Sequence, residues 1–280
     1  ISPLERCNLN CKMCYTCKTK TELSYADVIS FIERFKKVYL LEIVTFCGGE
    51  VFLLDWMTRI INSLTAKDII VEIITNGSID HLDQLEHSDG VNLIVSLDGL
   101  ESDHDLNRGR GSFARTWRFV EHAARLGFHL EFFCVVSTHN YSHLDKLEEW
   151  LAKHLGQMPV ITYHPRKPLS YLQQHPMSNR VGSTDPFGFI SSLQYRQLIK
   201  RKNVFPPRRL GCHQLSLMSN GLVYGCCEGI KPLGRMSDSI EELVARYQEN
   251  LANPSEFAKS CEGCAEPQFV CGLREAGYVA

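Results

Sequence analysis

Short apolar runs alternate with amphipathic segments over the first 165 residues, and this alternation limits the fold more than any other feature. The runs LLEIVTF, IIVEIIT, VNLIVSL and HLEFFCVVS have the length and the β-branched and aromatic content of buried strands. Segments with apolar residues at helical spacing, such as SYADVISFIERFKKVY, lie between strand-like runs. With ISPLER as the first strand and MPVITYH as the sixth, about six strand and helix units form a parallel sheet. The sequence therefore predicts an α/β fold, either doubly wound or a whole or partial barrel.

The pattern changes twice after this region, which indicates three parts. Residues 166–205 are rich in Pro, Ser and Gly and are typical of a long loop or lid. Beyond them, QLSLMSNGLVYGCC predicts a β-hairpin that turns at Asn220 and Gly221, and SIEELVARYQENL predicts a helix. We expect a main domain over 1–165, a linker or lid over 166–205 and a small cysteine-rich domain over 206–280.

Charge and cysteine usage narrow the class of protein. Thirty basic and thirty-two acidic residues leave a net charge of -2, which does not indicate a nucleic-acid or membrane-surface partner. The longest apolar runs have the length of strands, so no membrane span is expected, and no signal peptide is visible. The twelve cysteines lie in two clusters at the ends of a chain that is 44% hydrophobic. Metal binding in a reducing cytoplasm explains this better than a disulfide scaffold does.

Three cysteines near the N-terminus have a spacing that suits an iron-sulfur cluster. Cys7, Cys11 and Cys14 follow the pattern C-x3-C-x2-C directly after a predicted strand. Three thiolates leave one iron of a [4Fe-4S] cluster without a protein ligand, where a substrate or cofactor can coordinate. A structural zinc site with Cys17 as its fourth ligand is the alternative.

This spacing resembles the signature of the radical S-adenosylmethionine (SAM) superfamily, although Met13 stands where the family usually has an aromatic residue. The segments CGGE, ITNGS and VSLDGLESDHDLNRGRGSF also match. The resemblance implies a partial (β/α)6 barrel of the TIM type whose open iron is chelated by SAM. It further implies that Gly48, Gly49 and Glu50 hold the SAM amino group, Asn76 contacts SAM, Ser96 and Asp98 face the ribose or substrate, and Arg108 meets a SAM or substrate anion.

The C-terminal cysteines resemble a Twitch domain, the shortened form of the SPASM extension. Cys212, Cys226, Cys261 and Cys264 are separated by the predicted hairpin and helix, and would enclose a second, auxiliary [4Fe-4S] cluster. Zinc suits four thiolates equally well. The adjacent Cys227 resembles the hydrogen-atom donor of radical SAM peptide epimerases, and its alternative role is that of a packed apolar residue.

The resemblance also implies the reaction type. An electron from the reduced cluster cleaves SAM to methionine and a 5'-deoxyadenosyl radical, which abstracts a hydrogen atom from the substrate. A flavodoxin or ferredoxin is the expected electron donor. A ribosomal peptide, modified by epimerisation, oxidation or cross-linking, is the leading substrate, and a small metabolite such as an aminoglycoside is the alternative. A non-catalytic iron-sulfur or zinc protein is the hypothesis from a different class.

Overall fold

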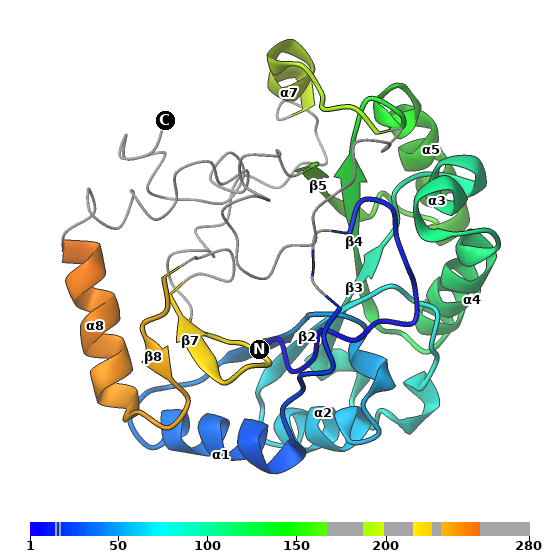
Figure 1. Cartoon of the computed structure of the whole chain (residues 1–280). Coiled ribbons are helices and arrows are strands. Elements are labelled where there is room, and N and C mark those ends of the chain that lie inside the picture. Colours follow the sequence, from blue (N-terminus) through cyan, green and yellow to red (C-terminus); the bar gives the residue numbers. More distant parts are fainter. Residues whose placement is uncertain (15, 17, 167–186, 199–214, 226–230, 253–280) are drawn as a thin grey trace.

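A parallel sheet of five strands forms the centre of the fold. The computed structural model describes residues 1–14, 16, 18–166, 187–198, 215–225 and 231–252. Neighbouring strands follow the order β1-β2-β3-β4-β5, and every pair is parallel. The sheet curves into a partial barrel that is open on one side (Figure 1). The strands are β1 (Ile43–Phe46), β2 (Ile70–Thr75), β3 (Val91–Ser96), β4 (His129–Val136) and β5 (Val160–Pro165). The α/β fold predicted from the alternation is confirmed, and it has the partial-barrel form that the resemblance implied.

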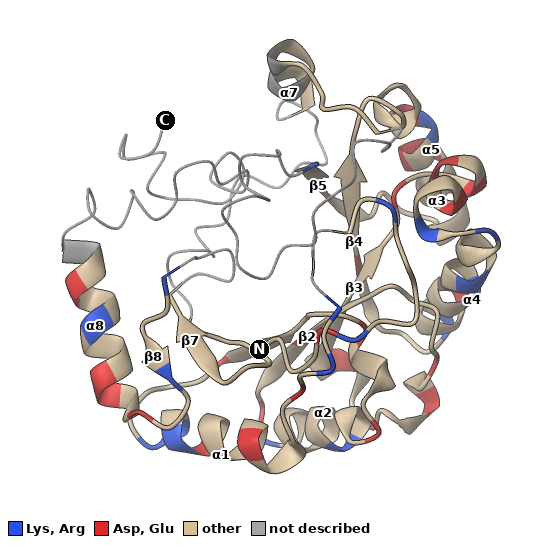
Figure 2. Ribbon diagram, viewed as in Figure 1, with Lys and Arg blue, Asp and Glu red and all other residues tan. Residues whose placement is uncertain are grey.

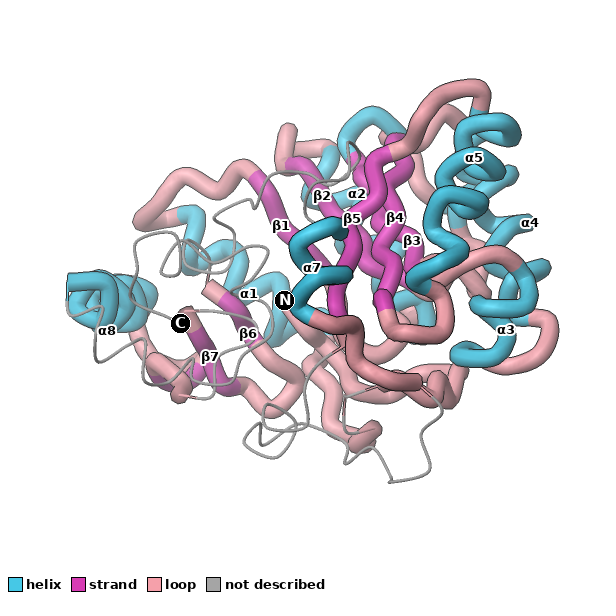
Figure 3. Tube along the Cα trace, turned by 90° about the horizontal axis from the view of Figure 1, so that it is seen from above, coloured by secondary structure: helices cyan, strands magenta, loops and turns pink. Residues whose placement is uncertain are grey.

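Helices connect the strands and cover the outer face of the sheet, as the views from the front and from above show (Figures 1 and 3). The α-helices are α1 (Tyr25–Lys36), α2 (Met57–Thr65), α3 (Glu101–Arg108), α4 (Ser112–Arg125) and α5 (Leu144–Leu155). Short 3-10 turns lie between them: η1 (Val51–Leu53), η2 (Leu82–Gln84), η3 (Ser88–Gly90) and η4 (Tyr141–His143). One connection after each strand, always on the outside, is the arrangement that right-handed crossovers produce.

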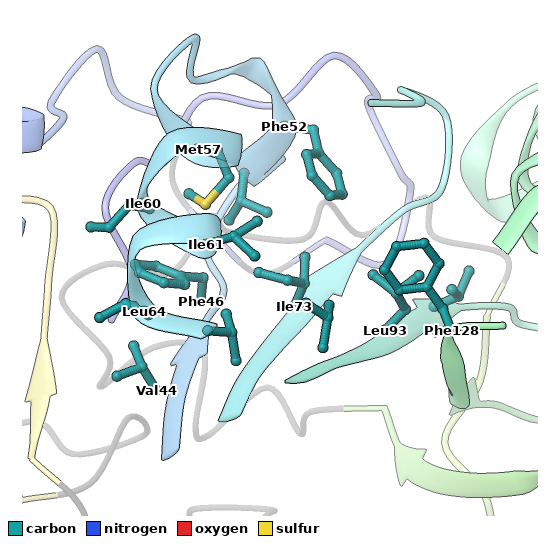
Figure 4. Packing of buried hydrophobic residues seen from close by; sticks show 14 of the residues in the cluster. Val44, Phe46, Phe52, Met57, Ile60, Ile61, Leu64, Ile73, Leu93 and Phe128 are labelled. Carbon is teal, nitrogen blue, oxygen red and sulfur yellow. The ribbon is translucent and has the colours of Figure 1, made fainter. Parts of the chain in front are cut away.

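The main core lies between the sheet and its outer helices. Met57, Ile61 and Leu64 of α2 are fully buried and pack beside Phe46 of β1 and Ile73 of β2 (Figure 4). Full burial of each such side chain contributes about 1.5–3 kcal/mol relative to exposure. The apolar residues of each strand therefore fix which face meets the helices, and the alternate residues face the inside of the barrel.

The start of α1 shows how local sequence defines an element. Ser24 accepts a hydrogen bond from the Asp27 backbone at 3.1 Å, and the Asp27 carboxylate accepts one from the Ser24 backbone at 3.0 Å. This capping box, predicted from the sequence, satisfies two amides that the helix itself leaves free.

Residues 1–6, which we expected to form the first strand, are not a regular strand. They run extended beside the end of β1, where Cys47 donates to the carbonyl of Ile1 at 3.0 Å and Gly49 donates to that of Leu4 at 2.9 Å. Only isolated bridges join this segment to Met218 and Glu22. The described sheet therefore has five strands instead of six. In place of the expected first strand, a short hydrogen-bonded segment lies beside the end of β1.

A small antiparallel sheet follows near the C-terminus. It contains β6 (Ser216–Leu217), β7 (Leu222–Tyr224) and β8 (Gly234–Arg235), and the helix α8 (Ile240–Ala252) comes next. The first two strands form the predicted hairpin, in which Gly221 has φ of 77°, a conformation that favours glycine. Arg34 of α1 donates to the carbonyl of Asp238 at 2.9 Å and also to that of Met236, which joins this part to the barrel.

The segment 166–205 is not a loop throughout. Residues 192–198 form helix α7 (Ser192–Leu198), and Tyr141 donates to Gln197 at 2.8 Å. The stretches 167–186 and 199–214, on which the rest of the lid prediction rests, lie outside the described residues. Charges of both signs are mixed along the outer helices (Figure 2). No helix in the described part of the chain is both long and apolar enough to cross a membrane.

Candidate metal and cofactor site

The loop that carries Cys7, Cys11 and Cys14 lies across the C-terminal ends of the strands. Its side chains and backbone bond to Asn76, directly after β2, and to Asn107, on the helix that follows β3. The carboxyl ends of parallel strands are where α/β barrels place their active sites. The three cysteines therefore stand at the functional end of the barrel.

The Cys7 end of the loop is held from β2. The Asn76 side-chain amide lies 3.7 Å from Cys7 Sγ and donates to Asn8 Oδ1 at 3.0 Å. Asn8 in turn donates to Ser78 Oγ at 2.8 Å. Asn76, expected from the resemblance to contact SAM, is 6% exposed and bonds to the loop in this structure.

Gly48 and Gly49 make room for the segment that leads into Cys7. A Cβ atom on Gly49 would lie 1.9 Å from the carbonyl oxygen of Arg6, and one on Gly48 would lie 2.4 Å from that of Leu4. Any side chain here would collide with backbone, which cannot turn aside as a flexible side chain can. The sequence predicted that these glycines let a backbone approach closely, and in this structure the backbone that approaches is the chain's own.

The Glu50 carboxylate is fully buried inside the chain. It accepts hydrogen bonds from the Asn76 backbone at 2.8 Å, the Thr75 hydroxyl at 2.8 Å and the Phe52 backbone at 3.2 Å. Burial raises its pKa above the ordinary value, because these hydrogen bonds replace only part of the lost hydration. Glu50 thus ties the end of β1 to the end of β2 in this structure.

The other end of the loop is held from α3. Lys12 donates its backbone N–H to the carbonyl of Asn107 at 2.9 Å, and Met13 donates its own to Asn107 Oδ1 at 3.0 Å. A turn between Cys11 and Cys14 is closed by a bond of 3.2 Å from the Cys14 backbone to the Cys11 carbonyl. Asn107 was not among the predicted site residues. It lies within the segment that matched the family, but nothing in the sequence indicates a bond to a residue 94 positions away.

Asp98 and Arg108 form a buried pair at the end of β3. Arg108 donates to the Asp98 carboxylate from Nε at 2.6 Å and from Nη2 at 3.1 Å, and the Val135 backbone adds a bond at 3.0 Å. Burial acts to raise the pKa of Asp98, but the charge of Arg108 outweighs it and holds this pKa below the ordinary value. Asp98 is 1% exposed. Its side chain is therefore held by Arg108 and by neighbouring backbone in this structure.

Ser96 lies on the concave face of the sheet. Val91, Leu93 and Val95 of the same strand belong to the core under the helices, so the alternate residues face the inside of the barrel. That face is polar at several levels: Thr45 donates to Glu72 at 2.6 Å, and Asn92 donates to Glu131 at 3.1 Å. The inside of the barrel thus offers hydrogen-bonding groups to a polar ligand.

The three cysteines are partly buried and form no disulfide. Burial raises the pKa of Cys11 to about 11 and also raises that of Cys7, while the nearby Arg108 favours the Cys11 thiolate. Among the described residues, no three His, Cys, Asp or Glu side chains converge closely enough to hold a single metal ion. The thiolates of a [4Fe-4S] cluster each bind a different iron, so they need not converge on one point.

The other cysteines with a predicted role lie outside the described residues. They are Cys17, a ligand only in the zinc alternative, the four expected auxiliary ligands Cys212, Cys226, Cys261 and Cys264, and the expected hydrogen donor Cys227.

A parallel barrel with an open three-cysteine loop at its C-terminal end defines a class of iron-sulfur enzyme, and the sequence comparison agrees. The family model of the radical SAM superfamily matches residues 1–151, and the chain belongs to this superfamily. Membership implies a [4Fe-4S] cluster and SAM, which the loop of Cys7, Cys11 and Cys14 would hold.

Individual relatives match about half of the chain or less. The mycofactocin maturase MftC of Mycobacterium ulcerans (strain Agy99) is 33% identical over 150 residues, which cover 50% of this chain and 40% of MftC. The antilisterial bacteriocin subtilosin biosynthesis protein AlbA of Bacillus subtilis (strain 168) is 29% identical over 124 residues, 41% of this chain and 28% of AlbA. The matches thus span less than half of either relative.

Solved structures share the fold over more of the chain. The structure of anSMEcpe with bound AdoMet and Cp18Cys peptide has a TM-score of 0.68 at 17% identity, and covers 89% of this chain and 80% of its own. This likeness extends well beyond residue 151, and at such low identity it concerns the fold alone.

Proposed function

We propose that this protein modifies a peptide, as a maturation enzyme of a ribosomally made natural product. The observation that carries the proposal is the match of this chain to parts of MftC and AlbA, whose names describe a maturase and a bacteriocin biosynthesis protein. The polar concave face supports it, because Glu72, Asn92 and Glu131 suit the backbone and polar side chains of a peptide.

The chain's own residues bind, orient and shield the reactants in this proposal. A bound, reduced cluster would supply the electron for the cleavage of SAM, and bound SAM would supply the radical chemistry that removes a substrate hydrogen atom. Cys7, Cys11 and Cys14 hold the cluster at the barrel mouth, and the segments around Asn76 and Asp98 fix their loop. Ser96 on the concave face faces the ribose or the substrate. The curved sheet surrounds the reacting groups and limits their exposure to water.

The C-terminal part, residues 206–280, forms a Twitch-type domain in our proposal. Cys212, Cys226, Cys261 and Cys264 bind an auxiliary [4Fe-4S] cluster, and Cys227 returns a hydrogen atom to the substrate radical if the product is an epimer. The hairpin of β6 and β7 supports this arrangement, because β7 ends at Tyr224, two residues before Cys226. A flavodoxin or ferredoxin supplies the electrons.

The test uses short peptides encoded beside the gene. Each is incubated anaerobically in deuterated water with the reconstituted protein, SAM and a strong reductant, and the products are weighed by mass spectrometry. An epimerase incorporates one deuterium without net oxidation, whereas an oxidase or cross-linking enzyme removes two hydrogens and incorporates none. Formation of 5'-deoxyadenosine with no change in any peptide, but with oxidation or epimerisation of an aminoglycoside, would refute the peptide proposal in favour of a small-metabolite enzyme.

A further inference from the structure

We propose that Asn107 is a positioning residue that fixes the Cys11 to Cys14 half of the cluster loop. Asn107 is the second-last residue of α3 and is 2% exposed. Its side-chain oxygen accepts the backbone N–H of Met13 at 3.0 Å, and its backbone carbonyl accepts that of Lys12 at 2.9 Å. Both donors lie between two of the three cysteines that we propose as cluster ligands. The inference therefore rests on that ligand set.

The same side chain is anchored to the sheet. Asn107 Nδ2 donates to Asp98 Oδ2 at 2.6 Å, and Asp98 is itself held by Arg108 and by the Val135 backbone of β4 at 3.0 Å. One amide thus links the loop to two strands. Because Asp98 is 1% exposed and has several hydrogen-bond donors, it has little freedom to move.

Asparagine is the side chain that this position requires. It must accept a hydrogen bond from Met13 with one atom and donate one to the Asp98 carboxylate with another. Aspartate would keep the acceptor but would place a second negative charge against Asp98, and leucine would provide neither group. The backbone N–H of Met13 is buried, so without Asn107 it would lose its partner and gain no water in exchange.

The loop is consequently fixed at both ends without any help from a metal. Asn76 and the close backbone contact between Gly49 and Arg6 hold the Cys7 end at the ends of β1 and β2. Asn107 holds the other end through its bond to Asp98 after β3. We infer that the loop geometry is set before the cluster is inserted. Partners that orient metal ligands typically change metal affinity 10- to 100-fold when they are removed.

The experiment compares Asn107→Leu with Asn140→Leu. Asn140 is a matched control because it is also a buried amide, 3% exposed, that donates to Asp98, here to the backbone carbonyl at 2.6 Å. Its other side-chain bonds are with Val135, Ser137 and Cys134, all outside the cysteine loop. Both substitutions remove several buried hydrogen bonds, so both lower the melting temperature. Only Asn107→Leu also removes a contact to the cysteine loop.

Two readouts separate positioning from stability, and neither needs SAM or a peptide. In the metal-free full chain, amide hydrogen exchange at Met13 should become about fivefold to tenfold faster in Asn107→Leu and stay unchanged in Asn140→Leu. After anaerobic reconstitution with iron and sulfide, cluster loss to a chelator should be about tenfold faster in Asn107→Leu alone. Equal exchange at Met13 and equal cluster loss in both variants would overturn the inference. If the protein does not modify peptides, both readouts still apply. The proposed function and the positioning role of Asn107 can therefore fail independently of each other.

Discussion

Replacement of Gly49 by alanine is the sharpest test of how the chain builds its site. The added Cβ atom would lie 1.9 Å from the Arg6 carbonyl oxygen, 2.5 Å from the Arg6 carbonyl carbon and 2.8 Å from the Glu5 carbonyl oxygen. Ordinary carbon-oxygen contacts begin near ~3.3 Å, so the segment before Cys7 must move away by roughly 1.4 Å. This movement disrupts the bonds from Gly49 to the Leu4 carbonyl at 2.9 Å and from Glu50 to the Arg6 carbonyl at 3.0 Å.

The size of the effect follows from these losses. Two backbone hydrogen bonds contribute about 1 kcal/mol each, and overpacking against backbone adds about 1–3 kcal/mol. We expect the free energy of unfolding to fall by about 3–5 kcal/mol. The matched control is Gly156→Ala, which has φ of 71° but nothing within 4 Å of the added atom. It should cost only about 1 kcal/mol, from backbone strain.

Urea unfolding of the metal-free proteins measures both values, and iron analysis after reconstitution measures the cluster. Gly49→Ala should be the less stable of the two and should bind less iron, since Cys7 follows the displaced Arg6 directly. The reasoning is refuted if Gly49→Ala is as stable as Gly156→Ala. It is refuted equally if the two variants differ in stability but hold the same amount of iron.

Three further predictions concern single side chains. Burial, together with the charge of Arg108, lowers the pKa of His104 to about 4 from an ordinary 6.5. Between these two pH values the unfolded chain therefore binds a proton on His104 that the folded chain does not bind. Between pH 6.5 and 4 the wild type should therefore lose about 3 kcal/mol of stability relative to His104→Asn, measured by urea unfolding at each pH, and a constant difference would contradict this. Glu50→Gln should cost about 1–3 kcal/mol, because its amide must face a backbone or hydroxyl donor, and an unchanged unfolding midpoint would exclude that role. Cys17→Ser should keep the SAM-cleaving cluster, whereas its loss, seen by iron analysis, would make Cys17 a ligand.

Local signals in the sequence predicted the elements of the fold well. The capping box at Ser24 and Asp27 and the turn at Asn220 and Gly221 each depend on residues a few positions apart, so the sequence shows them directly. The period of the apolar residues defined the strands and their buried faces. The first strand was the exception, since residues 1–6 pair only with the end of β1 and with isolated residues elsewhere.

The candidate site was predictable in its parts but not in its connections. Cysteine spacing indicated Cys7, Cys11 and Cys14, and the short motifs indicated Glu50 and Asp98. The sequence did not show that both carboxylates bond within the chain, because their partners lie on other strands or on later helices. Asn107 was missed for the same reason, since its contact with the loop exists only once α3 has packed at the end of β3. Motifs reveal the residue types that a site needs, and the fold adds which of these side chains bond to one another.

Cleavage of SAM by the reconstituted protein tests the central claim most directly. The full chain, loaded anaerobically with iron and sulfide, should convert SAM to 5'-deoxyadenosine and methionine when a strong reductant is added. Replacement of Cys7, Cys11 and Cys14 by alanine should abolish this cleavage. A wild-type chain that binds zinc in place of iron, or that carries iron and yields no 5'-deoxyadenosine, would contradict the account.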